Sequence, residues 1–301
     1  MLDYRLVEAF AAVIGEGGFE KAGQRLGLTQ SAVSQRVRNL EELAGTILVV
    51  RETPPRATPT GLRILRHFVQ VQALEQEAFG SALPGADDPL GSGFSRITLA
   101  VNGDSLATWF LGAIGPYLAE HSLLVDIKVD DQSQTINYLR SGEAMACISA
   151  RQESVTGCVS QRLGSMEYRL CAAPRFRDRW FPEGYTREAA ARAPIIHCTP
   201  DDDLQKMALA NCFGDEAPAP PAHYIPSTEQ IFQAVLSGFS YCMIPEIQAA
   251  AELEKGTLVE LAPEGRVWID LYWHRWSLTT AVMDEFEAEV FRNAGQSLAR
   301  V

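Results

Sequence analysis

Residues 18–41 read GFEKAGQRLGLTQSAVSQRVRNLE, and their pattern predicts two short helices joined by a tight turn. Three apolar residues recur at intervals of three and four and would share one face of the first helix: Phe19, Ala22 and Leu26. Gly27 comes directly afterwards and suits the left-handed residue that ends many helices. The hydroxyl of Thr29 can then cap the start of the second helix.

The second helix of the pair has two chemically different faces. Its apolar side carries Val33, Val37 and Leu40, and its opposite side carries Ser31, Ser34, Gln35 and Arg38. Ala22 and Gly23 on the first helix are small, which lets the two helices cross closely. This geometry predicts a helix-turn-helix, whose second helix enters the major groove of DNA, where Gln, Ser and Arg contact base edges and phosphates. The same periodicity also fits an ordinary amphipathic pair with a solvated face.

A longer stretch resembles a known family. Residues 26–51, LGLTQSAVSQRVRNLEELAGTILVVR, followed by T-x-x-G at 58–61, are similar to the N-terminal signature of LysR-type transcriptional regulators. The resemblance implies an N-terminal all-α winged helix-turn-helix with a long linker helix, and a C-terminal α/β effector-binding domain with two lobes, like a periplasmic binding protein. It also favours DNA binding over a solvated helical pair. The predicted DNA-binding residues are Thr29, Gln30, Ser31, Ser34, Gln35, Arg38, Arg51 and Arg56.

The segment after the helix pair has the pattern of a wing. Residues 47–50 predict a short apolar strand, and Pro54 and Pro55 in the next loop exclude a helix. Arg51 and Arg56 flank this loop, where they can reach phosphate or the minor groove. A surface hairpin with solvated arginines is the alternative, and the resemblance favours the wing.

A long amphipathic helix is predicted to follow the wing. Thr58 and Pro59 form a strong start signal, and apolar residues then recur as far as residue 79, over about six turns. In the resembled family this helix pairs with that of a second copy, which implies a homodimer, or a tetramer built from two dimers. Two recognition helices would then contact two half-sites of a double-stranded DNA operator.

Length and charge limit the class of protein. The 301 residues exceed what one compact domain needs, and a 47% hydrophobic share with 21% charged residues is typical of a soluble chain. The net charge is −12 at pH 7. Residues 1–66 carry nine Lys and Arg against seven Asp and Glu, a net of +2, whereas residues 81–301 carry a net of −12. The acidic part therefore lies away from the predicted DNA-binding region and disfavours non-specific binding to DNA.

The cysteines and the N-terminal residues indicate in which cellular compartment the protein is expected. Six cysteines without a C-x-x-C pair indicate free thiols in a reducing compartment, and neither a zinc site nor disulfides. The first residues, MLDYRLVEAF, predict a helix capped by Asp3 and no secretory signal. No stretch approaches the roughly 20 apolar residues of a membrane span. We therefore expect a cytoplasmic protein with no membrane partner, no metal and no cofactor.

The chain divides into a DNA-binding part and an α/β part. Residues 80–95, GSALPGADDPLGSGFS, concentrate Gly, Pro, Ser and Asp, which is typical of a linker. Strand and helix patterns alternate after it and predict a mostly parallel sheet with helices on its faces. The predicted divisions are 1–58 for the winged helix-turn-helix, 59–80 for the linker helix, 81–95 for the hinge and 96–301 for the effector-binding domain. The resemblance places lobe 1 at about 96–166 and 266–301, and lobe 2 at about 167–265.

A ligand site is expected where strands lead into helices, because ligands of open α/β sheets bind beyond the carboxyl ends of strands. Four such junctions supply the predicted effector-binding residues: Asn102, Asp104, Ser105, Thr135, Asp201, Asp202 and Thr228. Ordinary helix capping by Asp104 or Ser105, and a solvated turn at 201–203, are the alternatives.

Four further segments narrow the resemblance to the arginine/lysine-responsive branch of LysR-type regulators: VNGDSLATWFL at 101–111, DDQ at 130–132, YIPSTE at 224–229 and LYWHRW at 271–276. Members of that branch sense lysine or arginine and typically control an amino-acid exporter, with RNA polymerase as a further partner. A different small carboxylate effector, or an amino-acid-binding protein without a regulatory role, remains open. An enzyme is not expected, because G-x-S-x-G, Walker A, H-E-x-x-H and G-x-G-x-x-G motifs do not occur.

Overall fold

The computed structural model describes residues 3–79 and 94–299. The N-terminal part consists of α1 (Tyr4–Gly15), α2 (Phe19–Leu26), α3 (Gln30–Ala44), β1 (Val49–Val50), β2 (Arg56–Ala57) and α4 (Pro59–Phe79). The predicted helix pair is confirmed, because Gly27 follows α2 with a φ of 63° and Thr29 accepts a hydrogen bond from the Ala32 backbone N–H at 3.2 Å. The predicted cap at Asp3 is also confirmed, since its side chain accepts from the Arg5 backbone N–H.

The apolar faces of these helices meet in one small core. Its fully buried members include Val7, Phe10 and Val13 of α1 and Val33, Val37 and Leu40 of α3. Leu65 and Phe68 of α4 pack against the same cluster. The turn between α2 and α3 packs closely on Gly23, where a Cβ atom would lie only 2.7 Å from the carbonyl oxygen of Leu28. A small residue is therefore required at Gly23, although it makes room for the turn and the start of α3.

The wing is shorter than the sequence predicts. β1 and β2 pair antiparallel, with Val49 opposite Ala57. The strand predicted at 47–50 begins only at Val49, because the chain before it is held by α3 instead of a neighbouring strand. The backbone N–H groups of Leu48 and Val49 donate to the Glu41 carboxylate at 2.8 and 3.2 Å.

The long helix α4 also contacts the second part of the chain. Arg66 Nη1 donates to the Thr156 carbonyl at 3.1 Å. Gly142, which has a φ of 81°, lies against Arg66, and a Cβ atom there would come within 3.2 Å of the Arg66 backbone. α4 therefore packs on the winged helix-turn-helix and on the α/β part alike. Of the predicted hinge, residues 81–93 lie outside the described residues.

The second part alternates strands and helices. Its elements are β3 (Ser95–Asn102), α5 (Gly103–Ser105), a π-helical turn (Leu106–Phe110), α6 (Leu111–Glu120), β4 (Leu123–Asp130), α7 (Ile136–Ser141), β5 (Ala146–Ser149), β6 (Cys158–Ala172), α8 (Pro174–Trp180), α9 (Arg187–Ala190), β7 (Ile195–His197), α10 (Leu204–Phe213), β8 (Ala222–Tyr224), α11 (Thr228–Leu236), β9 (Tyr241–Pro245), α12 (Glu246–Lys255), β10 (Val259–Glu260), β11 (Val267–Trp276) and α13 (Ala281–Ser297). The strands form one sheet in the order β4-β3-β5-β11-β6-β9-β7-β8, and β10 pairs with β6.

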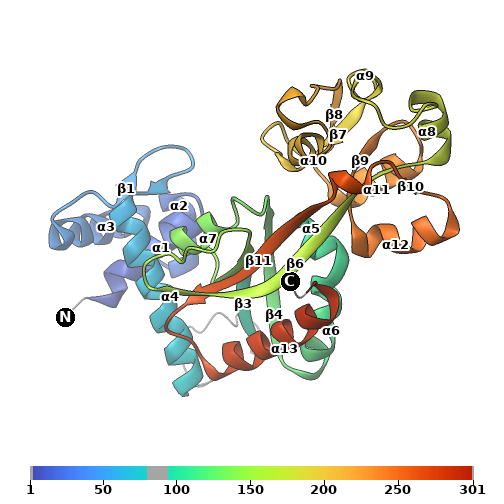
Figure 1. The fold of residues 1–301 in the computed structure, drawn as a ribbon. Coiled ribbons are helices and arrows are strands. Elements are labelled where there is room, and N and C mark those ends of the chain that lie inside the picture. Colours follow the sequence, from blue (N-terminus) through green and yellow to red (C-terminus); the bar gives the residue numbers. More distant parts are fainter. Residues whose placement is uncertain (1–2, 80–93, 300–301) are drawn as a thin grey trace.

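Two long strands connect two lobes. β6 and β11 run side by side from one lobe to the other (Figure 1). Their antiparallel register extends from Cys158 opposite Trp276 to Tyr168 opposite Val267. One lobe contains β3, β4, β5, α6 and α13, and the other contains β7, β8, β9 and α8 to α12 (Figure 1). The two-lobed α/β architecture that the resemblance implies is confirmed, and the likeness to a periplasmic binding protein remains an analogy of shape.

The sheet differs from the prediction in its long strands. β6 alone is 15 residues long, and the sheet is mixed instead of mostly parallel, because β11 is antiparallel to both β5 and β6 and β6 is antiparallel to β9. The chain crosses between the lobes twice in opposite directions, which requires this antiparallel pairing. Within residues 3–79 and 94–299, no helix is both long and apolar enough to cross a membrane.

Candidate functional site

The polar face of α3 is the first candidate site. Ser31, Gln35 and Arg38 are exposed and Ser34 is half-buried, whereas the opposite face of the helix is fully buried in the small core. Such a helix presents short polar side chains and one guanidinium to a partner. The face is therefore free to meet another molecule, in the geometry that a helix-turn-helix uses to read the major groove.

Hydrogen bonds between neighbouring side chains hold part of this polar face in place. Thr29 and Ser31 exchange a hydrogen bond between their hydroxyls at 3.0 Å, and Gln35 Nε2 donates to Asn39 Oδ1 at 2.8 Å. Thr29 and Gln30 are exposed at the start of α3. The helix thus presents a contiguous polar strip that begins at its N-terminal turn.

The wing arginines are exposed as well. The Arg51 guanidinium lies 5.5 Å from the centre of the Phe19 ring at the start of α2, which ties the wing loop to the helix pair. Arg56 Nε lies 3.7 Å from the Glu52 carboxylate, with about three quarters of the Arg56 side chain exposed (75%). All eight predicted DNA-binding residues are thus at least partly accessible, and their contacts with DNA remain a prediction.

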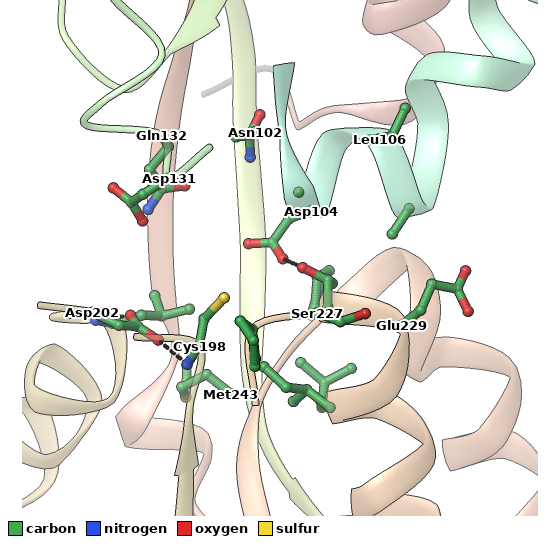
Figure 2. Close-up of a pocket in the computed structure, with 18 of the residues that line it drawn as sticks. Asn102, Asp104, Leu106, Asp131, Gln132, Cys198, Asp202, Ser227, Glu229 and Met243 are labelled. Atoms are coloured by element: carbon green, nitrogen blue, oxygen red, sulfur yellow. Dashed lines mark hydrogen bonds between the residues drawn. The ribbon is translucent and has the colours of Figure 1, made fainter. Parts of the chain in front are cut away.

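The second candidate site is a cavity of about 500 Å³ between the lobes. Its lining comes from the end of β3 and the helix after it, from residues 129–132 at the end of β4, from β6 and β9, from residues 198–205, and from α11 and α12 (Figure 2). Four of the predicted effector-binding residues meet there: Asn102, Asp104, Asp202 and Thr228. The structure thus brings together residues that are more than a hundred positions apart in the chain.

Asp104 joins the two lobes at this cavity. The Tyr168 hydroxyl donates to Asp104 Oδ2 at 2.6 Å, and the Thr228 hydroxyl donates to Oδ1 at 2.9 Å. Burial raises the pKa of Asp104, and the negative charges of Asp202 and Asp131 act in the same direction, while the two hydroxyl donors offset part of the rise. A cation beside Asp104 would stabilise its charged form.

The cavity as a whole is acidic. Five carboxylate side chains line it: Asp104, Asp130, Asp131, Asp202 and Glu229. Among its described lining residues there is no Lys or Arg to neutralise them. Asp202 accepts from the backbone N–H groups of Cys198 and Leu204, each at 3.0 Å, which fixes its carboxylate at the start of α10. This electrostatic setting favours a cationic ligand.

Three predicted effector-binding residues do not line the cavity. Thr135 is fully buried and donates its hydroxyl to the Ile148 carbonyl at 2.6 Å, so it stabilises the loop before α7. Ser105 is fully buried behind the first turn of the helix. Asp201 is exposed outside the cavity, because the turn at 201–203 directs only its middle aspartate inward. These three residues were predicted because they follow a strand. That position does not determine the direction in which a side chain points.

Several cavity residues were missed. Asp131, Gln132, Tyr168, Gln205 and Glu229 line the cavity but were not among the predicted site residues. Asp131, Gln132 and Glu229 lie in the DDQ segment at 130–132 and the YIPSTE segment at 224–229, which resemble the arginine/lysine-responsive branch. The resemblance could therefore have identified these three residues from the sequence. Tyr168 had no sequence signal, since it lies inside β6, whereas Gln205 lies in the first turn of α10, directly after the aspartates at 201–203.

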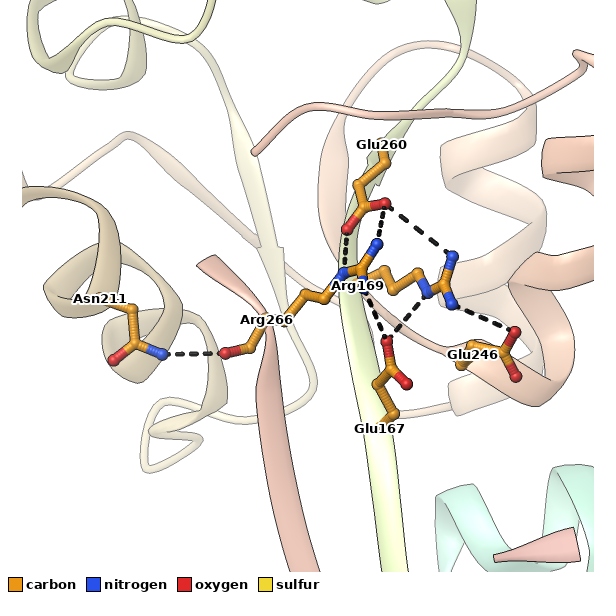
Figure 3. A network of polar contacts seen from close by, with 6 residues as sticks. All are labelled: Glu167, Arg169, Asn211, Glu246, Glu260 and Arg266. Atoms are coloured by element: carbon orange, nitrogen blue, oxygen red, sulfur yellow. Dashed lines mark hydrogen bonds and ion pairs between the residues drawn. The ribbon is translucent and has the colours of Figure 1, made fainter. Parts of the chain in front are cut away.

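An ion-pair network stabilises the second lobe beside the cavity. Arg169 donates to Glu167 at 3.1 Å and to Glu246 at 3.4 Å (Figure 3). Arg266 donates to Glu260 through Nε at 2.6 Å and also lies 3.6 Å from Glu167. The pairs connect β6, β10, α12 and the chain before β11. Because the side chains are largely buried, they are screened less than surface pairs.

Comparison with known proteins bears on both sites. The family model described as "Bacterial regulatory helix-turn-helix protein, lysR family" matches residues 4–62, and the "LysR substrate binding domain" matches residues 91–293. The HTH-type transcriptional regulator ArgP of Pseudomonas fluorescens is 43% identical over 277 residues, which cover 92% of this chain and 91% of that protein. The ArgP of Aeromonas salmonicida is 38% identical over 99% of this chain and 98% of its own length.

Solved structures agree with these relatives. The crystal structure of ArgP from Mycobacterium tuberculosis has a TM-score of 0.88 and 36% identity, covering 100% of this chain and 99% of that one. Full-length LysG from Corynebacterium glutamicum with its effector Arg bound has a TM-score of 0.80 and 27% identity, covering 99% and 100%. The relatives are named as transcriptional regulators and not as enzymes, in agreement with the expectation from the sequence. The chain belongs to the LysR family and is a DNA-binding transcriptional regulator.

Proposed function

We propose that this regulator senses a basic amino acid, arginine or lysine, in the acidic cavity between its lobes, and changes transcription in response. The observation that carries the proposal is the set of five carboxylates around the cavity without a cationic lining residue among those described. A basic amino acid supplies a positive side chain and an α-ammonium group to such a setting, whereas a purely anionic effector would be repelled. The arginine bound to the related LysG supports the same chemistry.

The binding test uses isothermal titration calorimetry on the full chain with arginine, lysine, glutamate and citrulline. We expect arginine or lysine to bind, citrulline to bind more weakly and glutamate not to bind. Asp104→Asn removes a carboxylate that faces the ligand, so it should weaken arginine binding by roughly tenfold to a hundredfold. Asp178→Asn is the matched control, since Asp178 is exposed on α8. Tight binding of glutamate, or no binding of any basic amino acid, would refute the sensor assignment and favour a different carboxylate effector.

On the DNA side, we propose that α3 contacts base edges through Ser31, Gln35 and Arg38, with Ser34, Thr29 and Gln30 at its start and the wing residues Arg51 and Arg56 on the backbone. The exposed polar face of α3 supports this assignment. A gel-shift assay against the upstream DNA of the chain's own locus tests it, and indifference to every operator offered would contradict it.

We further propose that the protein acts in the cytoplasm as a homodimer, paired through α4, with a tetramer of two dimers on a full operator. α4 is 21 residues long and would place two recognition helices on half-sites one helical turn, or a multiple, apart. Binding of the effector would change the placement of the dimers, and so the bend of the DNA and the access of RNA polymerase. Light scattering with and without operator DNA measures the assembly, and a stable monomer on DNA would contradict it.

We propose that the regulated gene encodes an amino-acid exporter. A cell that detects an excess of a basic amino acid can respond by exporting it. Transcript levels of neighbouring exporter genes, measured with and without added arginine in cells with and without the regulator, test this. Equal responses in both strains would contradict the assignment.

A further inference from the structure

The two strands that connect the lobes form a narrow ribbon over part of their length (Figure 1). β5 pairs with β11 only from Tyr272 to Arg275, and β9 pairs with β6 only from Tyr168 to Ala172. Between these two regions, residues 164–167 of β6 pair with β11 and with no other named strand of the described residues. A two-stranded ribbon is less stable than a wider sheet. The sheet is therefore weakest between the lobes.

The ribbon is bent at its start. The pairing register shifts between Leu271 and Tyr272 of β11, so Leu163 of β6 has no residue opposite it. Such a β-bulge bends a strand and increases its twist. The next residue, Gly164, has a φ of 155°, which glycine adopts more readily than other residues. The angle at which the chain leaves the first lobe is therefore set at Leu163 and Gly164.

The residues that follow α13 lie on this bend. The Ser165 backbone N–H donates to the Ala299 carbonyl at 3.1 Å, and the Ala299 N–H donates to the Ser165 carbonyl at 2.9 Å, in an antiparallel bridge. Leu298 is 6% exposed and fills the space beside Gly164, where a Cβ atom would lie only 2.7 Å from Leu298 Cβ. Leu298 and Ala299 thus form a strap that adds a third chain to the ribbon at Ser165.

Ser165 is held on both of its sides. Its backbone bonds to the strap, and its side-chain hydroxyl donates to the Asp270 carboxylate of β11. Arg162 Nη2 donates to Ser165 Oγ at 2.7 Å and to Asp270 Oδ1 at 2.8 Å, which connects the residues before and after the bulge. The strap itself is anchored to the first lobe, since Asn293 of α13 donates to the Ala113 carbonyl of α6 at 3.1 Å. The strap therefore ties the ribbon to the first lobe.

We propose that Leu298 and Ala299 hold the lobes in the arrangement in which they meet at the cavity, where the Thr228 hydroxyl donates to Asp104. The strap fits the bent ribbon, because Leu298 occupies the space that the backbone of Gly164 leaves open. Straightening the bend would separate the strap from the ribbon. A contact made in only one of two arrangements shifts the equilibrium toward that arrangement. Resting on the function proposed above, an effector that contacts both lobes therefore binds more tightly when the strap is in place.

The test weakens the strap at its exposed residue. Ala299→Pro removes the N–H that the Ser165 carbonyl accepts, and the extended backbone of Leu298 (φ −99°, ψ 146°) accommodates a following proline. Ala299→Ser keeps the N–H and is the matched control. Hydrogen exchange of the full chain without ligand should become about threefold to tenfold faster at residues 103–110 and 228–236, where the lobes meet away from the strap. The Ala299→Ser variant should exchange like the wild type.

Arginine binding gives a second measurement. Calorimetry should show about threefold to tenfold weaker binding for Ala299→Pro and no change for Ala299→Ser. Leu298→Ala empties the space beside Gly164 and should act in the same direction as Ala299→Pro in both measurements.

Faster exchange confined to the residues around Ser165, with the lobe contacts unchanged, would overturn the inference, as would unchanged or tighter arginine binding by Ala299→Pro. If the wild-type protein binds neither arginine nor lysine, the proposed function fails. The exchange measurement, which needs no ligand, then still decides whether the strap holds the lobes together.

Discussion

The polar face of α3 and the cavity between the lobes differ in how the chain builds them. Ser31, Gln35 and Arg38 are neighbours on one helix, whose opposite face is buried in a core made within the first 68 residues. The cavity instead takes Asn102 and Gln205 from different lobes and Thr228 from a third segment. A site made by one helix follows from local periodicity, whereas a site made by several segments depends on long-range strand pairing. The two sites should therefore respond independently to substitutions.

The largest effect is expected for a substitution in the N-terminal core, which tests whether that core is energetically independent of the cavity. Phe10 is fully buried at its centre, so Phe10→Ala should lower the free energy of unfolding of the N-terminal part by roughly 3–5 kcal/mol. Leu43→Ala is the control, because Leu43 is 67% exposed, and it should have little effect. Urea unfolding measures the loss. Arginine affinity should be unchanged under native conditions. A parallel loss of arginine binding would contradict the independence of the two sites.

A smaller effect is expected for operator binding. Arg38→Ala removes an exposed guanidinium from α3, which should weaken operator binding by about 1–3 kcal/mol. Arginine binding should be unaffected, since Arg38 is not a cavity residue. Fluorescence anisotropy on labelled operator DNA measures the change at a stated salt concentration, with Arg192→Ala on the exposed surface of the α/β part as the control. Equal losses for the two variants would mean that the polar face of α3 does not read DNA.

Ion pairs in the two regions should differ in their contribution to stability. Arg169→Met leaves Glu167 and Glu260 with Arg266 alone and removes the ion pair of Glu246, and should cost roughly 1–2 kcal/mol because these side chains are at most 34% exposed. Arg56→Met removes the exposed pair with Glu52, where the expected change is below roughly 0.5 kcal/mol. Urea unfolding of both variants in low and high salt measures the difference. Equal costs would show that the burial of the network has no energetic consequence.

The smallest expected effect is a pH dependence at Asp104. Its pKa is raised in the folded chain, so the folded state binds a proton more readily than the unfolded state, and stability gains as the pH falls from neutral toward the raised pKa. The Tyr168 and Thr228 hydroxyls offset part of the effect of burial, so the gain is smaller than burial alone would give. Between pH 7 and about pH 5, the wild-type protein should gain stability relative to Asp104→Asn. A relative loss on acidification would contradict this sign.

The contrast between a site built by one helix and a site built by several segments also explains how much of the structure could be predicted from the sequence. The helix pair, its cap at Thr29 and the small residue at Gly23 follow from spacing and residue size, although Gly23 makes room for the turn at Leu28. Asp104 and Thr228 were predicted as ligand residues from their place after strands, and the cavity contains both. Their hydrogen bond to each other could not be predicted, because it depends on two lobes that meet only after β6 and β11 have paired.

Side-chain direction explains the remaining errors. Thr135 and Asp201 stand at the predicted junctions, but one donates inward to a carbonyl and the other faces solvent. Tyr168 lies inside β6, where no capping residue or turn marks it, whereas Gln205 closely follows the aspartate turn at 201–203 and was still not predicted. A position near a strand end can be read from one sequence, whereas the direction of its side chain depends on loop geometry that one sequence does not contain.

The π-helical turn at residues 106–110 makes the position of Asp104 depend on the number of residues behind it. Such a turn holds one residue more than a regular helical turn, and it lies between α5 and α6 within one continuous helix. Deleting a single residue there would restore regular winding and rotate everything before it by about 100° about the axis. Asp104 would then leave Tyr168 and Thr228, so the position of this carboxylate depends on the extra residue in the π-helical turn.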